Sequence, residues 1–209
     1  MTDKIYITLA VEDLLSEAIL RSILRQSERP YHVLSCIGLT GFGYLRLNIK
    51  KLNQAARKTP ILVLTDLDRT ECAPILLREW LNVSPHKNLI FRVAVREVES
   101  WIMAHRKAFA AFLGIGINLV PTNPDELADP KRTLLDLAAR SRKRELREAI
   151  VPAPKSTAKV GPDYNGRLGE FVMMNWDVCE AAQNSLSLGK AFRAIASFDP
   201  TQEGVPCPR

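Results

Sequence analysis

The feature that most constrains the fold is an alternation, over the first half of the chain, of short apolar runs with segments of helical period. The apolar runs are rich in β-branched residues and predict strands at 5–9, 31–37, 61–65 and 89–95. Helical patterns occupy the intervals at 15–23, 45–57, 74–81 and 100–113. Strands that are apolar along their length and separated by helices are typical of a parallel sheet covered on both faces. The sequence therefore predicts an α/β, Rossmann-like fold with a mostly parallel four-stranded sheet flanked by helices.

The second half of the chain is patterned differently. A proline-rich connection at 120–130 leads into helical patterns at 127–150, 168–186 and 189–196. We therefore expect an α/β core over residues 1–118, a helical extension or small subdomain over 119–198, and a flexible tail over 199–209. The pattern leaves open whether the helical part covers the same sheet or stands apart from it.

Bulk properties exclude several classes of protein. A chain of 209 residues can bury one sizeable core. No apolar run approaches the roughly 20 residues that span a bilayer, and the first residues are not typical of a signal peptide. The cysteines form no Cys-x-x-Cys pair, which argues against a zinc knuckle or a disulfide framework. We expect a cytoplasmic protein without a membrane partner.

Acidic residues follow three of the four predicted strands. Glu12 follows the first strand, Asp66 and Asp68 the third, and Glu97 and Glu99 the fourth. The carboxyl ends of parallel strands lie at one edge of a sheet, so these acids are expected to meet there. Carboxylates placed together raise one another's pKa unless a cation neutralises them, and hard oxygen ligands suit Mg²⁺ or Mn²⁺. The sequence predicts a site for one of these ions.

Each acid also has a plainer interpretation. A single Asp after a strand is most often a turn or helix-cap residue, and Asp13 is assigned to that role. Glu17 is interpreted equally well as a further metal ligand or as a solvated helix residue. Glu97 and Glu99 share one face only if the backbone there stays extended, so at least one of them is expected to be structural. If these acids bind no metal, the plain interpretation has to apply independently at each of the three strand ends.

Two further features suggest phosphate binding. The loop at 38–43 contains Gly41 and Gly43 and leads into a helix, whose N-terminus could receive a phosphate, although a simple strand–helix turn explains it equally well. The net charge of +6 permits a polyanionic partner. Part of the excess forms a basic segment, interpreted either as a phosphate-contacting face or as a solvated helix face, with Arg140, Arg142, Lys143 and Arg144. The tryptophans Trp80, Trp101 and Trp176 are expected in the core rather than as stacking platforms.

The order of these motifs resembles the TOPRIM pattern of topoisomerases, bacterial primases and OLD-type nucleases. A strand ending in Val11-Glu12 is followed by a helix with a second acid, Glu17, and then by a strand ending in Asp66-x-Asp68. The segment 96–104 resembles a Glu-x-Glu-x-Trp-x-x-Ala segment of uncharacterised TOPRIM-like proteins linked to phage defence. The residues at 129–131, the loop around Tyr164 and the stretch 185–198 are also similar to that group.

The resemblance implies residue roles. It makes Glu12 a general acid/base or metal ligand, Asp66 and Asp68 the metal-binding pair, and Glu99 the downstream acid with Glu97 beside it. The chain departs from the family at Asp13, where glycine is usual, and at Glu17, which lies one residue beyond the commonest spacing. These departures put Glu17 in more doubt than Glu12.

The resemblance also implies an activity. The chain has no room for the separate tyrosine-bearing domain of a topoisomerase and no zinc module of a primase, which leaves a metal-dependent nuclease acting on nucleic acid, with DNA preferred to RNA. Lys131 or Lys155 would neutralise charge on the phosphate. No Gly-x-x-x-x-Gly-Lys-Ser/Thr motif occurs, so an ATPase of the OLD type would be a separate protein encoded nearby.

Two alternatives remain open. Asp66-x-Asp68-x-Thr70 also matches the nucleophile motif of haloacid-dehalogenase-type phosphatases, with Asp66 as the covalent nucleophile. That motif usually opens the chain and needs a later acidic motif with aspartates. The second alternative is a catalytically inactive TOPRIM-like module that binds nucleic acid or a partner protein, since a fold does not guarantee activity.

Overall fold

The sheet is four-stranded and entirely parallel, as predicted. The computed structural model describes residues 4–39 and 43–201. The strands are β1 (Ile5–Val11), β2 (Tyr31–Gly38), β3 (Ile61–Asp66) and β4 (Leu89–Ala94), in the order β2-β1-β3-β4. Each strand extends the predicted run or matches it to within about a residue at either end. The central position of β1 and β3 places Glu12 and Asp66 side by side in the sheet order.

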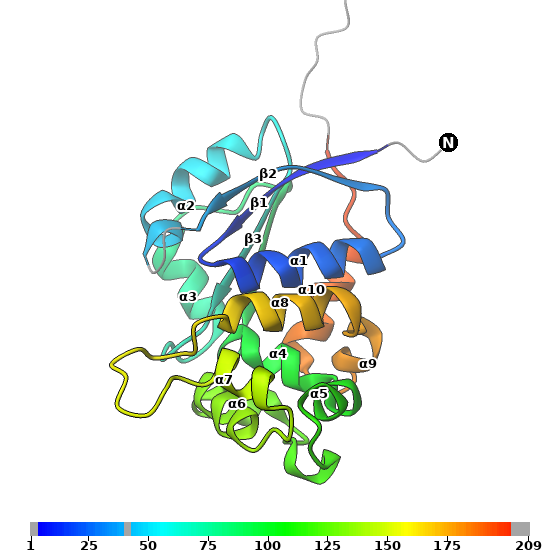
Figure 1. The fold of residues 1–209 in the computed structure, drawn as a ribbon. Coiled ribbons are helices and arrows are strands. Elements are labelled where there is room, and N and C mark those ends of the chain that lie inside the picture. The colour runs from blue at the N-terminus through cyan, green and yellow to red at the C-terminus, as the bar shows by residue number, and fades with distance from the viewer. Residues whose placement is uncertain (1–3, 40–42, 202–209) are drawn as a thin grey trace, which may run out of the picture.

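Both faces of the sheet are buried along β3, and this explains its unbroken apolar run, whereas the edge strand β2 has no fully buried residue. In β3, Leu62 and Leu64 face one hydrophobic cluster and Ile61 and Val63 face the other. One face is covered by α2 (Tyr44–Ala55) and α3 (Ala73–Trp80), and the other by α1 (Leu14–Gln26) and later helices (Figure 1). The α/β class predicted from the sequence is confirmed.

The first helix begins where the sequence indicates. The carboxylate of Asp13 accepts a hydrogen bond of 2.7 Å from the backbone N–H of Ser16, so Asp13 is an N-cap, as predicted. Leu15, Ile19 and Ile23 recur on one face of α1 and are fully buried against the sheet. This cap fixes the turn that follows Glu12.

The helical second half packs on the α1 face of the same sheet. It contains α6 (Pro130–Ala139), α7 (Arg144–Ile150), α8 (Tyr164–Met174), α9 (Val178–Ala182) and α10 (Leu186–Ala196). In Figure 1, α8 runs beside α1. The hydroxyl of Ser22 on α1 donates to the backbone carbonyl of Val172 on α8 at 3.1 Å. Phe171 and Leu188 lie in one hydrophobic cluster with β1 and α1, so the helices after residue 118 share their core with the sheet.

Three predicted helices are interrupted. The pattern at 168–186 forms α8 and α9, with residues 175–177 between them. The pattern at 100–113 forms α4 (Val98–Ala104) and α5 (Arg106–Leu113), because the backbone of His105 leaves the helical region and its Nδ1 accepts from the N–H of Asp177 at 3.0 Å. The pattern at 127–150 divides into α6 and α7, with Ser141 between them donating to the Leu113 carbonyl at 2.6 Å. Short 3-10 turns lie at η1 (Ile117–Leu119) and η2 (Pro124–Glu126). Tertiary contacts override the local period at His105 and at Ser141.

The beginning of the predicted flexible tail is tied down. Thr201 donates from its backbone N–H to Asn88 Oδ1 at 2.9 Å and accepts from Asn88 Nδ2 at 2.9 Å. Residues 202–209 lie outside the described part of the chain. Within the described ranges, no helix has the length and apolarity needed to cross a bilayer. The described cysteines Cys36, Cys72 and Cys179 are free thiols.

Candidate functional site

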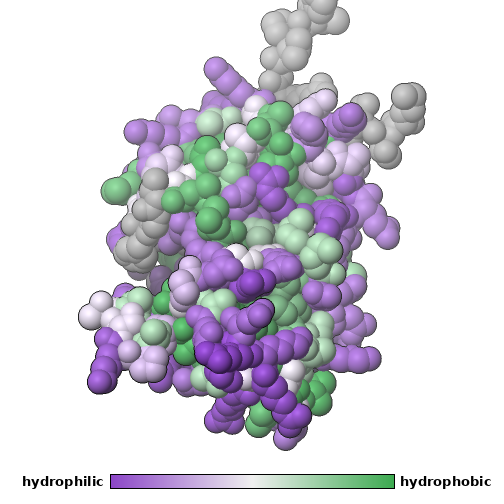
Figure 2. All heavy atoms as spheres, in the orientation of Figure 1, coloured by the Kyte–Doolittle hydropathy of each residue, from purple (hydrophilic) through white to green (hydrophobic). Residues whose placement is uncertain are grey.

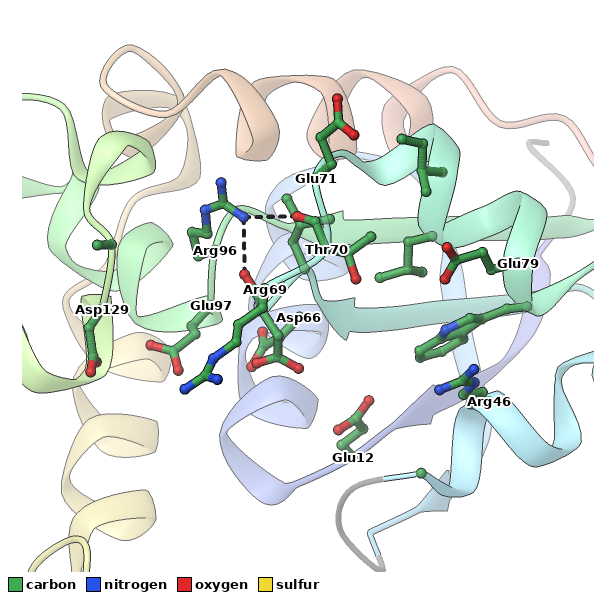
Figure 3. Close-up of a pocket in the computed structure, with 17 residues that line it drawn as sticks. Glu12, Arg46, Asp66, Arg69, Thr70, Glu71, Glu79, Arg96, Glu97 and Asp129 are labelled. Carbon is green, nitrogen blue, oxygen red and sulfur yellow. Dashed lines mark hydrogen bonds between the residues drawn. The ribbon is translucent and has the colours of Figure 1, made fainter.

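The structure brings four predicted acids to one pocket. Glu12 follows β1 directly, Asp66 ends β3, Asp68 lies two residues beyond, and Glu97 precedes α4 after β4. All four line a pocket of about 870 Å³ at the carboxyl edge of the sheet (Figure 3). Sites in parallel α/β sheets form at this edge, because the loops that leave the strands diverge there.

Glu12 is held by its neighbour in the sheet. The hydroxyl of Thr65, on β3, donates a hydrogen bond of 2.8 Å to Glu12 Oε1. Burial raises the pKa of Glu12, and the carboxylates of Asp68 and Asp13 add to this rise, whereas the Thr65 bond opposes it. The net result is a carboxyl group that ionises less readily than an exposed glutamate.

Asp66 lies deepest among the pocket acids. Its Oδ1 accepts a 2.9 Å hydrogen bond from the backbone N–H of Val98, the first residue of α4. Burial raises the pKa of Asp66 well above its usual range, and the carboxylates of Glu99, Asp13 and Asp68 act in the same direction. Negative charge is therefore concentrated around this side chain without enough positive charge to compensate for it.

Glu97 and Glu99 point in different directions because α4 begins between them. Glu97 lines the pocket, and its Oε2 accepts from the backbone N–H of Lys131 at 2.8 Å. Glu99 is 1% exposed. Its Oε1 accepts a hydrogen bond of 2.7 Å from the Tyr164 hydroxyl and forms an ion pair with Lys131 Nζ at 3.3 Å. Its second oxygen, Oε2, is buried and has no hydrogen-bond partner among the described residues. Glu97 is the pocket residue of the pair, and Glu99 lies behind it.

Of the two candidate lysines, Lys131 is the one that lies beside the acids. It is half-buried at the start of α6. Burial alone would lower the pKa of Lys131, but the carboxylates of Glu99, Glu97 and Asp66 outweigh it and the pKa is raised, so the ammonium stays charged. Lys155, the other sequence candidate, lies in the exposed loop before α8 and makes no contact with these acids.

The loop that carries Asp68 is fixed by Arg96. The backbone N–H of Asp68 donates to the Arg96 carbonyl at 3.0 Å, and Arg96 Nη1 donates back to the carbonyls of Asp68 at 3.1 Å and Thr70 at 2.8 Å. Asp68 has a φ of 49°, in the left-handed region that few residues other than glycine adopt, although Asp is among those that tolerate it. Arg96 thus holds a backbone turn that presents the Asp68 carboxylate to the pocket.

Glu17 is not part of this site. Its Oε1 pairs with Arg21 one turn along α1, at 2.8 Å, and it does not line the pocket. Gly43 does line the pocket, as the left-handed residue (φ 97°) that caps α2, whereas Gly41 lies outside the described residues. The Glu17 side chain is 17% exposed and pairs within its own helix, so the structure does not bring it to the other acids.

The basic segment also lies away from the acids. It follows the carboxyl end of α6, and the ten residues of that helix extend about 15 Å from the end that carries Lys131. Arg144 pairs with Glu148 at 2.7 Å and Lys143 donates to the Ala111 carbonyl at 3.2 Å. Hydrophilic side chains gather over this lower part of the molecule in Figure 2. None of the four basic residues lines the acidic pocket, namely Arg140, Arg142, Lys143 and Arg144.

Other residues of the site were not identified from the sequence. Thr65 and Tyr164 hold Glu12 and Glu99, and their roles depend on contacts across 53 and 65 residues of chain. Arg46, Arg69 and Trp80 line the pocket. Trp101 and Trp176 are buried, as predicted, but Trp80 is only half-buried. The one available signal was the position of Arg69 directly after the Asp-x-Asp pair.

The donor set fits a hard divalent cation in chemistry. It consists of carboxylate oxygens, and burial, with neighbouring carboxylates, raises the pKa of Glu12, Asp66 and Glu97. Within residues 4–39 and 43–201, however, no three acidic, histidine or cysteine side chains converge closely enough to hold an ion as they stand.

Comparisons with known proteins add no assignment. No protein-family model, curated protein or solved structure matches the chain. The TOPRIM resemblance therefore stays a prediction that rests on the order and spacing of short motifs.

Proposed function

We propose that this protein hydrolyses phosphodiester bonds of nucleic acid, DNA in preference to RNA, with Mg²⁺ or Mn²⁺ as cofactor. The observation that supports the proposal is the gathering of Glu12, Asp66, Asp68 and Glu97 from three strand ends in one pocket. Carboxylates whose pKa values are shifted and that lie in a cleft are typical of functional sites. We place this activity in the cytoplasm, and a separate ATPase partner remains a prediction from the resemblance.

Each residue has a role in the proposed mechanism. Asp66, Asp68 and Glu12 would hold the cation, which would supply charge stabilisation at the phosphate and a more acidic water. Glu97 would hold a second ion or orient the attacking water. Lys131 neutralises charge that develops on the phosphate. Glu99 is too deeply buried to reach substrate, so it acts by keeping the Lys131 ammonium in place at 3.3 Å.

One observation favours the inactive module as a second candidate. No described trio of acids is arranged to hold an ion as it stands, and Lys131 already has an acidic partner in Glu99. An inactive module would bind nucleic acid or a partner protein without cleaving it. Calorimetric titration with Mn²⁺ separates the two candidates, because only an intact site gives metal binding that depends on Asp66 and Glu12.

Cleavage by matched carboxylate variants tests the proposal. Single-stranded and duplex DNA are incubated with Mg²⁺ or Mn²⁺ and wild-type protein, Asp66→Asn, Glu12→Gln or Glu17→Gln. We expect the first two substitutions to lower the rate by at least about 100-fold, because each removes a charged ligand of the cation. Glu17→Gln is the control, a glutamate on the adjacent helix that lies outside the pocket. Unchanged cleavage in both pocket variants, with folding confirmed by circular dichroism, would refute the assignment.

A further inference from the structure

The pocket continues beyond the acids toward α2 and α3. This end is lined by the apolar side chains of Ile75, Leu76 and Trp80 on α3 and by Arg46 in the first turn of α2. The volume of about 870 Å³ lies within the range of small-molecule and cofactor sites. A metal site for one phosphate does not account for this apolar end, which we call the Trp80 end.

Trp80 differs from the other tryptophans of the chain. Trp101 is 0% exposed and Trp176 is 3% exposed, and the indole N–H of each is hydrogen-bonded. Trp80 is half-buried, borders the pocket, and makes an edge contact with Phe91 of β4, with ring centroids 6.0 Å apart. Phe91 anchors the indole to the sheet, while the rest of the Trp80 surface contributes to the pocket wall.

Two cations flank the acids and have no acidic partner within the described ranges. Arg46 and Arg69 are exposed and line the pocket, but neither forms an ion pair with a described carboxylate. In the view of Figure 3, Arg69 lies on the Glu97 side of Asp66 and Arg46 on the opposite side, beyond Glu12. Some other arginines among the described residues do pair with nearby acids, for example Arg144 with Glu148 at 2.7 Å. Two uncommitted guanidinium groups beside a row of acids are suited to phosphates on either side of a central one.

We propose that the Trp80 end is a subsite for one unstacked nucleobase, with its phosphate at Arg46, so that the pocket binds single-stranded nucleic acid. This rests on the proposed function and specifies its substrate class. A base can stack on an indole only after it leaves its duplex neighbours, and single-strand sites combine an aromatic platform with cations along the backbone. Arg69 contacts the backbone on the other side of the scissile phosphate. Duplex DNA, whose bases are stacked on one another, cannot supply the free base that this surface fits.

Tryptophan fluorescence provides the test. Trp80 is the tryptophan that borders the pocket, so a base stacked on it should quench emission saturably. The Asp66→Asn protein in Mg²⁺ is titrated with a 12-residue oligodeoxythymidylate, with a hairpin duplex of the same total length, and with thymidine monophosphate. We expect quenching and tight binding with the single strand and weak binding with the other two ligands.

Variants assign the effect to particular side chains. In the same Asp66→Asn protein, Trp80→Leu should weaken single-strand binding, measured by fluorescence anisotropy of a labelled oligomer, by roughly 5- to 150-fold. Trp80→Phe keeps an aromatic face and the packing on Phe91, so it should retain most of the affinity. Arg46→Ala should weaken binding and reduce the slope of log affinity against log salt by roughly 0.7, because one phosphate contact is lost. Arg78→Ala, on α3 but outside the pocket, is the matched control.

The outcomes separate this inference from the proposed function. If the wild-type protein cleaves no nucleic acid but quenching and the Trp80 effects appear, the nuclease proposal fails and the subsite stands. If it cleaves DNA while Trp80→Leu and Arg46→Ala bind like the Arg78→Ala control, the subsite is refuted and the nuclease stands. Equal affinity for the duplex, or for thymidine monophosphate alone, would also overturn the single-strand assignment.

Discussion

Asp66 combines a fixed backbone position with an unfavourable electrostatic environment. One carboxylate oxygen is bonded to the Val98 amide, while burial and the charges of Glu99, Asp13 and Asp68 raise the pKa of the group. Glu12 and Glu97 have raised pKa values as well, and burial is the first cause for both. The folded chain therefore bears a free-energy cost at neutral pH for keeping these groups ionised, and a bound cation would offset it.

This cost should be visible in the pH dependence of stability. Between its ordinary pKa of 3.8 and its raised value, Asp66 binds more protons in the folded state than in the unfolded state. The free energy of unfolding contributed by Asp66 therefore falls as pH rises through this window and is constant above it. Asp66→Asn keeps an oxygen acceptor for Val98 and removes the charge. Its stability gain over wild type should be absent near pH 3.8 and grow at higher pH, as measured by urea unfolding with a chelator present.

Asp136→Asn is the control for this measurement. Asp136 is an exposed acid on α6, paired with Arg132 at 3.2 Å, and its removal should not produce a gain that grows with pH. Addition of Mg²⁺ or Mn²⁺ should reduce the advantage of Asp66→Asn, because the cation stabilises only the charged wild-type site. If the difference in unfolding free energy between Asp66→Asn and wild type stays constant from pH 4 to pH 8, the surroundings do not raise the pKa of Asp66.

At the scale of helices and strands, tyrosine hydroxyls connect the second half of the chain to the first. Tyr164 opens α8 and donates to the buried carboxylate of Glu99 on α4 at 2.7 Å. Tyr31 opens β2 and donates to the backbone carbonyl of Ile195 on α10 at 2.6 Å. Both bonds join distant parts of the chain, but only the first has a charged acceptor. Bonds to charged acceptors contribute more to stability.

Removal of these two hydroxyls should have unequal effects. Tyr164→Phe deletes a donor to a buried carboxylate that already has one unsatisfied oxygen, so it should lower the free energy of unfolding by about 1.5–3 kcal/mol. Tyr31→Phe removes a bond to a neutral carbonyl and should cost about 0.5–1.5 kcal/mol. Urea denaturation of the two variants under the same conditions measures the difference. Equal losses would indicate that Glu99 is held by Lys131 alone.

Element positions could be predicted well where local signals and packing agree. The strands, the Asp13 cap and the acids at the strand ends follow from alternation, capping chemistry and the geometry of parallel sheets. The break at His105 could not be predicted, because the helical period continues through it and the deciding contact comes from Asp177. The inward direction of Glu99 depends similarly on Tyr164. Side-chain roles fixed by distant partners leave no local trace in the sequence.

At the scale of the whole molecule, one hydrophobic cluster joins the two halves of the sequence. Phe171 on α8 is fully buried and packs against Phe109 and Phe112 on α5, with ring centroids 5.8 Å and 4.7 Å apart. The same cluster contains β1, α1 and α10. The division predicted near residue 118 therefore crosses a shared core, and we expect the chain to unfold cooperatively.

Deletion of one core side chain tests this cooperativity. Phe171→Ala should lower the free energy of unfolding by about 3–5 kcal/mol, through lost burial and a cavity. The unfolding midpoints from far-UV circular dichroism and from tryptophan fluorescence should still coincide. Met174→Ala, on the same helix but 76% exposed, should change stability by less than about 0.5 kcal/mol. Separate midpoints would instead assign α8 to an independently folding unit.

The bond between Thr201 and Asn88 has a practical consequence. Asn88 immediately precedes β4, and the described chain starts at Lys4, just before β1, so both described ends lie at the amino edge of the sheet. The acids lie at the opposite edge. The described chain therefore begins and ends at the edge of the sheet opposite the pocket, and a surface tether bound at that edge would leave the pocket open to large substrates in solution.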